Sequence, residues 1–349
     1  MPNTIFDMFT APNIVGYIEA QAPTINDPYL GAALFPNRKN AGLDLSWLKQ
    51  HTGVAVQLKA SSFDVKAELR NRVGIAKIDT EMAFFKEAMR IGEKDRQDLL
   101  RVNEAYAQPI IARIFDDIGN LVKGVDVAAE RMRMQLLADG QISVTRDGAD
   151  YEYDYQFPVA HKETISAAAN KWSATETADP IADIERWRDV IIAGGGSAPN
   201  RAVCNNTVWK HLRNNLSIRK AMNPVGYANI KVKPDDVRQY IYDATKVTVE
   251  VYDKTYALEV GGSVYKYYPD NKFTLIPDGD LGNTFYGTTP EEADLMGGVS
   301  TDAQVSLINT ATAVTVTRES DPVNVNTKVS AVLLPSLPSI GSIFIATVA

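Results

Sequence analysis

Residues 265–287 read YKYYPDNKFTLIPDGDLGNTFYG, a run of aromatic and β-branched residues that is interrupted by Pro, Asp, Asn and Gly. The apolar segment Phe273–Ile276 is typical of a strand, and Asp278-Gly279-Asp280 is typical of a turn. Tyr265, Tyr267 and Tyr268 could stack on a base or a sugar, but such clusters more often form a core or a subunit interface. Because no catalytic motif occurs in this stretch, we interpret it as structural.

The composition is that of an ordinary globular protein, with 349 residues of which 45% are hydrophobic and 23% charged. This length predicts two or three structural units. The net charge of −7 and the lack of a Lys/Arg-rich run disfavour tight binding of nucleic acid. Neither a leader-like N-terminus nor an apolar run of about 18 residues occurs, so we expect synthesis in the cytosol and no membrane span.

The single cysteine, Cys204, excludes an intrachain disulfide and does not suggest a metal cluster. It lies in RAVCNN, which is typical of a strand, and a buried inert thiol is the expected role. A nucleophilic role is the alternative, with His211 as the partner base, but no third orienting group can be assigned.

The first 42 residues predict an arm rather than a domain, because prolines recur too often for a long helix except near Ile14–Glu19. Apolar side chains such as Phe6, Phe9, Leu34 and Phe35 have no local core to enter. We expect them to pack against a neighbouring subunit, and a flexible tail is the alternative.

Residues 43–80 show short apolar/polar alternation, which predicts a two-stranded ribbon. An isolated ribbon is marginal in water unless another layer covers its apolar face. Trp47, Val56, Leu58 and Phe63 are therefore candidates for contact with another part of the chain or with another molecule.

An apolar stripe recurring every three to four residues predicts a long helix over about 104–138. We expect it to lie along a sheet, and coiled-coil pairing is the alternative. After it, ISVT and YEYDYQF flank Asp147-Gly148, which predicts a hairpin.

Asp179-Pro180 starts a predicted helix that Gly194–Gly196 stops. A strand at RAVC, a helix over 206–222 and further strands then predict a compact α+β unit. Strands from 300 onward, ending in SIGSIFIATVA, are expected to return beside the long helix, which makes the α+β unit an insertion.

Candidate chemical motifs are weak. The glycines 194–196 lie between a helix and a strand, the reverse of the order that a phosphate-binding loop requires. Asp278, Asp280 and Asp183 give a remote alternative, a metal-dependent enzyme, but the calcium-loop pattern is incomplete. We predict no catalytic, cofactor or metal site.

Three segments resemble the E-type, lambda coat protein-like, major capsid proteins of tailed bacteriophages. They are DPIADIERWRDVI with the following VWKHLRNN, the block 265–287, and ESDP with the strands after it. In lambda-like members a Pro-Asp-Asn pattern precedes an apolar strand and Gly-Asn, as at Pro269-Asp270-Asn271 and Gly282-Asn283 here. The similarity covers about half the chain at the level of motifs.

The resemblance implies an α+β HK97-like coat fold. Its parts would be an N-terminal arm (1–42), an E-loop hairpin (43–80), a peripheral domain with a spine helix at about 104–138 (81–178 and 310–349) and an inserted axial domain (179–309).

The resemblance also implies a non-enzymatic structural protein whose copies form hexamers and pentamers of an icosahedral head shell. That shell would enclose double-stranded DNA without sequence-specific binding, in the virion, after synthesis in the host cytoplasm. A separate scaffolding protein, a portal and a decoration protein would be partners, and no cofactor or membrane is implied. An encapsulin-like compartment is the alternative. The candidate interface residues are Phe6, Phe9, Leu34, Phe35, Trp47, Val56, Leu58, Phe63, Tyr265, Tyr267 and Tyr268.

Overall fold

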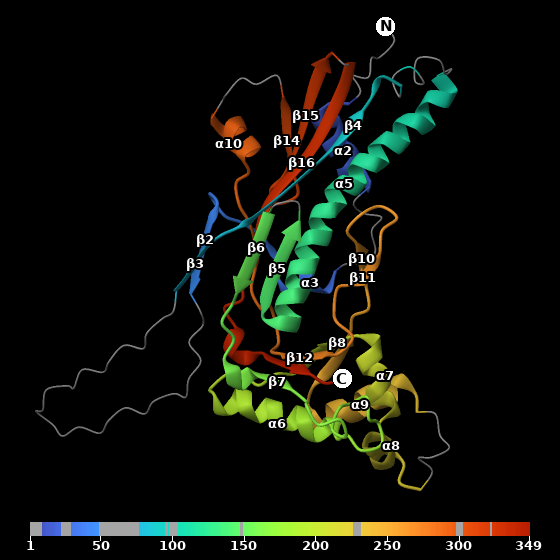
Figure 1. Cartoon of the computed structure of the whole chain (residues 1–349), viewed down its shortest axis with the longest axis vertical. Coiled ribbons are helices and arrows are strands. Elements are labelled where there is room, and N and C mark those ends of the chain that lie inside the picture. The colour runs from blue at the N-terminus through green and yellow to red at the C-terminus, as the bar shows by residue number, and fades with distance from the viewer. Residues whose placement is uncertain are drawn as a thin grey trace, which may run out of the picture. The chain divides into compact units, whose positions relative to one another are not determined.

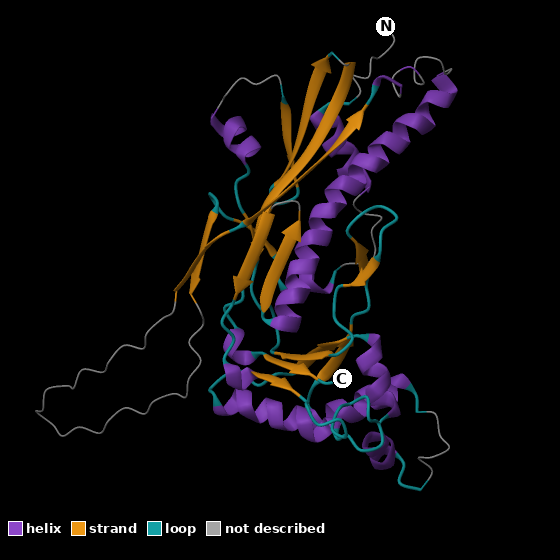
Figure 2. Ribbon diagram, viewed as in Figure 1, coloured by secondary structure: helices purple, strands orange, loops and turns teal. Residues whose placement is uncertain are grey.

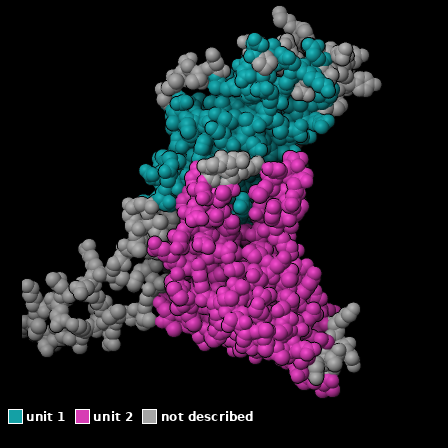
Figure 3. Space-filling view, viewed as in Figure 1, with its two compact units in different colours: residues 1–46, 79–131, 283–336 teal, residues 47–78, 132–282, 337–349 magenta. Residues whose placement is uncertain are grey.

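Helices and strands are mixed along the chain, which confirms the predicted α+β class (Figures 1 and 2). The computed structural model describes residues 9–21, 29–48, 77–94, 97, 104–146, 149–225, 232–297, 303–321 and 323–349. The chain divides into two units, each assembled from three segments (Figure 3). Unit 1 contains residues 1–46, 79–131 and 283–336, and unit 2 contains residues 47–78, 132–282 and 337–349.

Unit 1 is built on a six-stranded sheet with the order β1-β13-β16-β15-β14, in which β4 also pairs with β16. Its strands are β1 (Asn37–Lys39), β4 (Ala83–Ile91), β13 (Thr284–Tyr286), β14 (Gln304–Ile308), β15 (Thr312–Ser320) and β16 (Val323–Pro335). β16 is long because its alternate side chains, such as Val325 and Val329, are buried and rich in β-branched residues. All pairs of this sheet are antiparallel except β1 with β13.

The helices of unit 1 are α2 (Ala11–Gln21), α3 (Leu30–Leu34), α10 (Pro290–Gly297) and the part of α5 (Glu104–Asp139) up to Arg131. α2 contacts β14 and β15. Two ion pairs hold α10: Lys39 Nζ lies 2.5 Å from Glu292 Oε2, and Lys328 Nζ lies 2.5 Å from Glu291 Oε1.

The predicted ribbon is described only at its two ends. β2 (Asp44–Leu48) pairs with β3 (Lys77–Glu81), as the alternation over 43–80 predicts. Residues 49–76 between them lie outside the described residues.

Unit 2 contains a five-stranded sheet with the order β7-β17-β12-β8-β9. Its strands are β7 (Lys162–Thr164), β8 (Arg201–Cys204), β9 (Thr248–Val251), β12 (Lys272–Ile276) and β17 (Phe344–Thr347). The helices are α6 (Pro180–Ala193), α7 (Asn206–Asn214), α8 (Leu216–Met222) and α9 (Pro234–Thr245), with short 3₁₀ turns η2 (Val159–His161) and η3 (Ile340–Ser342). A separate hairpin, β10 (Thr255–Ala257) and β11 (Val264–Lys266), lies between β9 and β12 in sequence.

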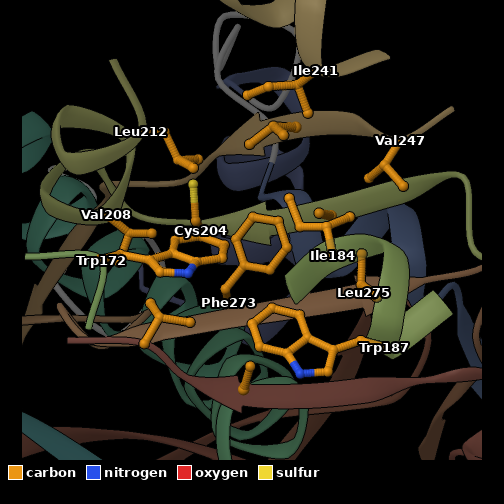
Figure 4. Close-up of a cluster of buried hydrophobic side chains, with 14 of the residues drawn as sticks. Trp172, Ile184, Trp187, Cys204, Val208, Leu212, Ile241, Val247, Phe273 and Leu275 are labelled. Atoms are coloured by element: carbon orange, nitrogen blue, oxygen red, sulfur yellow. The ribbon is translucent and has the colours of Figure 1, made fainter. Parts of the chain in front are cut away.

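Aromatic side chains pack against one another within the core of unit 2, among aliphatic residues (Figure 4). The ring centroid of Trp187 lies 5.8 Å from that of Trp172 and 5.4 Å from that of Phe344. Phe273 of β12 packs edge-on against Trp172 at 4.9 Å. α6 covers this part of the core because Ile184, Trp187 and Ile191 follow one another at helical spacing and are all fully buried.

Several local predictions are confirmed. The Asp179 side chain accepts a hydrogen bond from the Ala182 N–H at the start of α6, and Gly194 caps its end. β5 (Gln141–Arg146) and β6 (Ala149–Asp154) pair as a hairpin, with Arg146 opposite Ala149. The long helix, predicted at about 104–138, is α5 at Glu104–Asp139.

Two predictions of secondary and tertiary structure are wrong. The helix predicted over 206–222 is broken at Asn215, whose backbone is extended and whose side chain caps α8 by accepting from the Ser217 and Ile218 N–H groups. The closing strand β17 was expected beside the long helix, but it pairs with β12 and β7 in the sheet of unit 2.

The boundary between the units also differs from the predicted limits of the inserted domain, 179–309. The chain passes from unit 2 to unit 1 after Gly282, inside the block 265–287, because β13 joins β16 in the sheet of unit 1.

In the described part of the chain, none of the helices combines the length and the apolar character needed to cross a membrane.

Candidate functional site

A row of tyrosines runs along the β10–β11 hairpin. Tyr256 of β10 faces Tyr265 of β11, and their ring centroids are 5.7 Å apart. Tyr267 continues the row at 4.8 Å from Tyr256, and Tyr252 follows at 6.2 Å from Tyr267. The hairpin is therefore supported by side-chain packing as well as by its three backbone pairs.

Ion pairs hold the foot of the hairpin, the end opposite its turn. Lys266 Nζ lies 3.2 Å from Asp253 Oδ1 and 2.7 Å from Asp270 Oδ1. Asp270 also accepts hydrogen bonds from Thr207, at 2.6 Å, and from Asn205. The hydrogen bond from Lys266 lowers the pKa of Asp270, and the same contact raises the pKa of Lys266. The Pro-Asp-Asn motif thus ties the hairpin to the N-terminus of α7.

Two of the predicted interface tyrosines lie inside unit 2 instead. Tyr267 and Tyr268 are buried, and burial raises the pKa of Tyr268. The Tyr268 hydroxyl lies 2.7 Å from Thr274 Oγ1, which donates to the Leu137 carbonyl at 2.8 Å. These side chains have no free surface for a second subunit, so the prediction is corrected for both.

The described arm residues are also buried, within unit 1. Phe9, Leu34 and Phe35 are at most 2% exposed. The Phe9 ring lies 5.0 Å from that of Phe115 in α5, and the Gly31 N–H donates to Glu130 at 2.9 Å. The core that these residues enter is not local, as expected, but a helix about 100 positions later in the same chain supplies it, so the expected packing against a neighbouring subunit is corrected.

Of the other predicted interface residues, Tyr265 alone has a described side chain. Tyr265 is 46% exposed and stays available for contact. Phe6, Val56, Leu58 and Phe63 lie outside the described residues, and Trp47 belongs to β2 with an undescribed side chain.

The weak chemical motifs have structural explanations. Gly194 and Gly195 end α6, with Gly195 at φ +76°, as expected for a helix stop. Asp278–Asp280 form an exposed bend with Gly279 at φ +77°, and Arg201 donates to the Pro277 carbonyl at 2.7 Å beside it. Among the described residues, no group of three or more His, Cys, Asp or Glu side chains could hold a metal ion.

Cys204 is fully buried in β8, and burial raises the pKa of its thiol. A thiol in this state is a poor nucleophile because little thiolate forms near neutral pH. This agrees with the predicted inert role.

A polar network, which the sequence reading did not identify, lies at the rim of the aromatic core. The indole N–H of Trp187 donates to Glu163 at 2.6 Å, and that of Trp172 donates to Asp183 at 3.0 Å. Arg186 binds both carboxylates, 2.5 Å from Glu163 and 2.8 Å from Asp183. The hydrogen bond from Arg186 is the main reason that the pKa of Glu163 lies below the usual value of 4.5. The network links β7 to α6.

Glu163→Gln is expected to destabilise the protein by about 1 kcal/mol at pH 7, because this ion pair is partly exposed. Because the pKa of Glu163 is lower in the folded state than in the unfolded state, its ionised carboxylate stabilises the fold at pH values above the unfolded-state pKa. That contribution is lost as the pH falls through the folded-state pKa. The difference between wild type and variant should therefore shrink below pH 4.5. Unfolding by guanidinium at a series of pH values from 7 to 3 measures this difference in the free energy of unfolding. Glu176→Gln, at an exposed turn, is the control and should change stability little at pH 7. A difference for Glu163→Gln that stays constant from pH 7 to pH 3 would contradict the assignment.

The family comparison and the comparison with solved structures both match phage proteins. The model of the family described as phage major capsid protein E matches residues 12–348. A comparison with curated proteins gives no match.

Solved structures share the fold over nearly the whole chain. A prophage protein of E. coli CFT073, described as a candidate capsid protein, is 14% identical with a TM-score of 0.63, covering 98% of this chain and 99% of that one. A phage-related protein from Bordetella bronchiseptica RB50 is 13% identical with a TM-score of 0.53, covering 95% and 96%. The capsid protein of cyanophage A-1(L) is 11% identical with a TM-score of 0.53, covering 92% of each chain.

At these identities the solved structures establish the fold, which is HK97-like, and the family model establishes the kinship. The resemblance noted in the sequence is therefore confirmed, although the three segments that carried it span only part of the matched region. The chain belongs to the phage major capsid protein E family and is a structural shell protein of the virion.

Proposed function

We propose that copies of this chain form hexamers and pentamers that close into an icosahedral head shell around phage DNA. The observation that carries the proposal is the family match over residues 12–348. The fold shared with the cyanophage capsid protein over 92% of the chain supports it.

In this proposal residues 1–42 act as the N-terminal arm, 43–80 as the E-loop, the remaining residues of unit 1 as the peripheral domain and the remaining residues of unit 2 as the axial domain. The pairing of β2 with β3 supports a ribbon that starts and ends at one place. Phe6, Trp47, Val56, Leu58, Phe63 and Tyr265 remain the candidate contacts between subunits. Packing between subunits would stabilise a ribbon that is marginal alone.

The shell would act without catalysis and would enclose DNA without reading its sequence. A net charge of −7 is compatible with enclosing DNA, because a coat that bound phosphates tightly would hinder packing and release of the genome. A separate scaffolding protein, a portal and a decoration protein are the proposed partners, and the host cytoplasm is the proposed place of synthesis.

Expression of the full chain, alone and with a candidate scaffolding protein, followed by negative-stain electron microscopy, tests the proposal. Closed particles of uniform diameter are the expected result under at least one condition. Soluble monomers under both conditions would count against a shell.

A further inference from the structure

Apolar side chains cluster at the tip of the β10–β11 hairpin, defined here as residues 258–265. Val260 is fully exposed, Val264 is 68% exposed and Leu258 is 43% exposed. Tyr265 follows at 46%. Exposed apolar side chains gathered in one short segment are typical of a surface that another surface covers.

The tip has a well-supported base. The tyrosine row and the Lys266 ion pairs hold the hairpin at its foot, and Gly261, with φ +75°, makes the turn. Open space surrounds the Cβ position of Gly261. Ring contacts and ion pairs therefore orient a hairpin whose end is apolar, which favours a contact surface over an irregular loop.

We infer that the hairpin tip is a contact that a second copy of this chain covers. The inference rests on the proposed function, because in a shell built mainly from one chain most neighbours of each copy are further copies. Glu259 is the single charged residue of the tip, and its sign disfavours a nucleic acid or an anionic lipid surface.

Two hairpin ends that meet tip to tip would cover little area, so we place the complement of the tip on a different surface of the neighbouring copy. Such a contact is heterologous, and repetition of a heterologous contact generates a closed ring when the rotation closes. The tip would thus contribute to the rings that the proposed shell requires.

Val260→Asp tests the contact by placing a carboxylate where an apolar side chain is buried on assembly. The fraction of chain in particles at a fixed concentration is expected to fall at least about tenfold, because a buried unpaired charge is costly. Val225→Asp is the matched control, since Val225 is 98% exposed in another loop of unit 2 and should assemble normally. Both side chains are exposed, so both variants should keep the far-ultraviolet circular dichroism of the wild type. Normal assembly of Val260→Asp, or an equal loss in the control, would overturn the inference.

Val260→Cys measures the burial directly, because the native Cys204 is fully buried and unreactive. The rate of maleimide labelling should fall at least about tenfold between dispersed chains and particles purified away from co-expressed proteins. Val225→Cys should label at the same rate in both. Equal rates for Val260→Cys, or protection only after a second protein is added, would overturn the inference while the proposed shell stands. Failure of the wild type to form particles would overturn both.

Discussion

Trp187→Ala is expected to lower the free energy of unfolding by about 4 kcal/mol, the usual cost of removing a large aromatic side chain from a core. The Trp187 side chain is fully buried and stacks against Trp172 and Phe344. The substitution also removes the indole donor of Glu163, which lies 2.6 Å away. Guanidinium unfolding of dispersed chains, followed by circular dichroism, measures the loss.

Trp187→Phe separates packing from hydrogen bonding, because it keeps most of the ring and deletes the donor. Its expected loss is about 2 kcal/mol, from one missing hydrogen bond and a smaller cavity. Hydrogen exchange should show that the loss falls on β8, β12 and β17, the three central strands of the sheet beside this core. A loss below about 1.5 kcal/mol for Trp187→Ala would contradict the packing described for unit 2.

Lys39→Met is expected to destabilise the protein by about 3 kcal/mol, because it leaves the Glu292 carboxylate buried without its cation. Glu292 is 2% exposed, and its Oε2 lies 2.5 Å from Lys39 Nζ. Lys39 also donates to the Gly287 carbonyl at 3.2 Å, so the same side chain connects β1, α10 and the segment between β13 and α10. The same guanidinium titration measures the effect.

The double variant Lys39→Met with Glu292→Leu tests this explanation. Replacing both charges by apolar groups should recover most of the loss and leave a deficit of about 1 kcal/mol. Lys86→Met in β4, an exposed position, is the matched control and should change stability little. If the two single losses simply added in the double variant, the ion pair would not be the cause.

Local signals in the sequence predicted much of the secondary structure. Asp179-Pro180 and Gly194 fixed both ends of α6, and Asp147-Gly148 fixed the hairpin of β5 and β6. The break at Asn215 was missed because an asparagine that caps the next helix is also compatible with a continuous helix. α9 was missed although Pro234 with Asp235 and Asp236 is a helix start signal.

Long-range pairing was harder to predict. The apolar pattern of Phe344–Thr347 indicates a strand but not its partner, and β12 and β7 precede it by many residues. Phe9 and Phe35 had no visible core because the packing surface comes from distant segments of unit 1. Local patterns alone therefore predicted that buried residues such as Phe9 and Phe35 lie at an interface.

The candidate contact site was predicted in part. Tyr265 is exposed as expected, whereas Tyr267 and Tyr268, two and three positions later, are core residues. β11 ends at Lys266 and its three residues are all exposed, so a strand pattern could not separate Tyr265 from the two tyrosines that follow. The apolar tip was missed, although Val260 beside Gly261-Gly262 places an apolar side chain in a turn, where polar residues are usual.

Electron cryomicroscopy of particles formed by the full chain tests the shell most directly. We expect a closed shell in which rings of five and rings of six copies occur together, with each copy matching the HK97-like fold. Sheets or filaments that never close, or particles whose subunits have another fold, would contradict it.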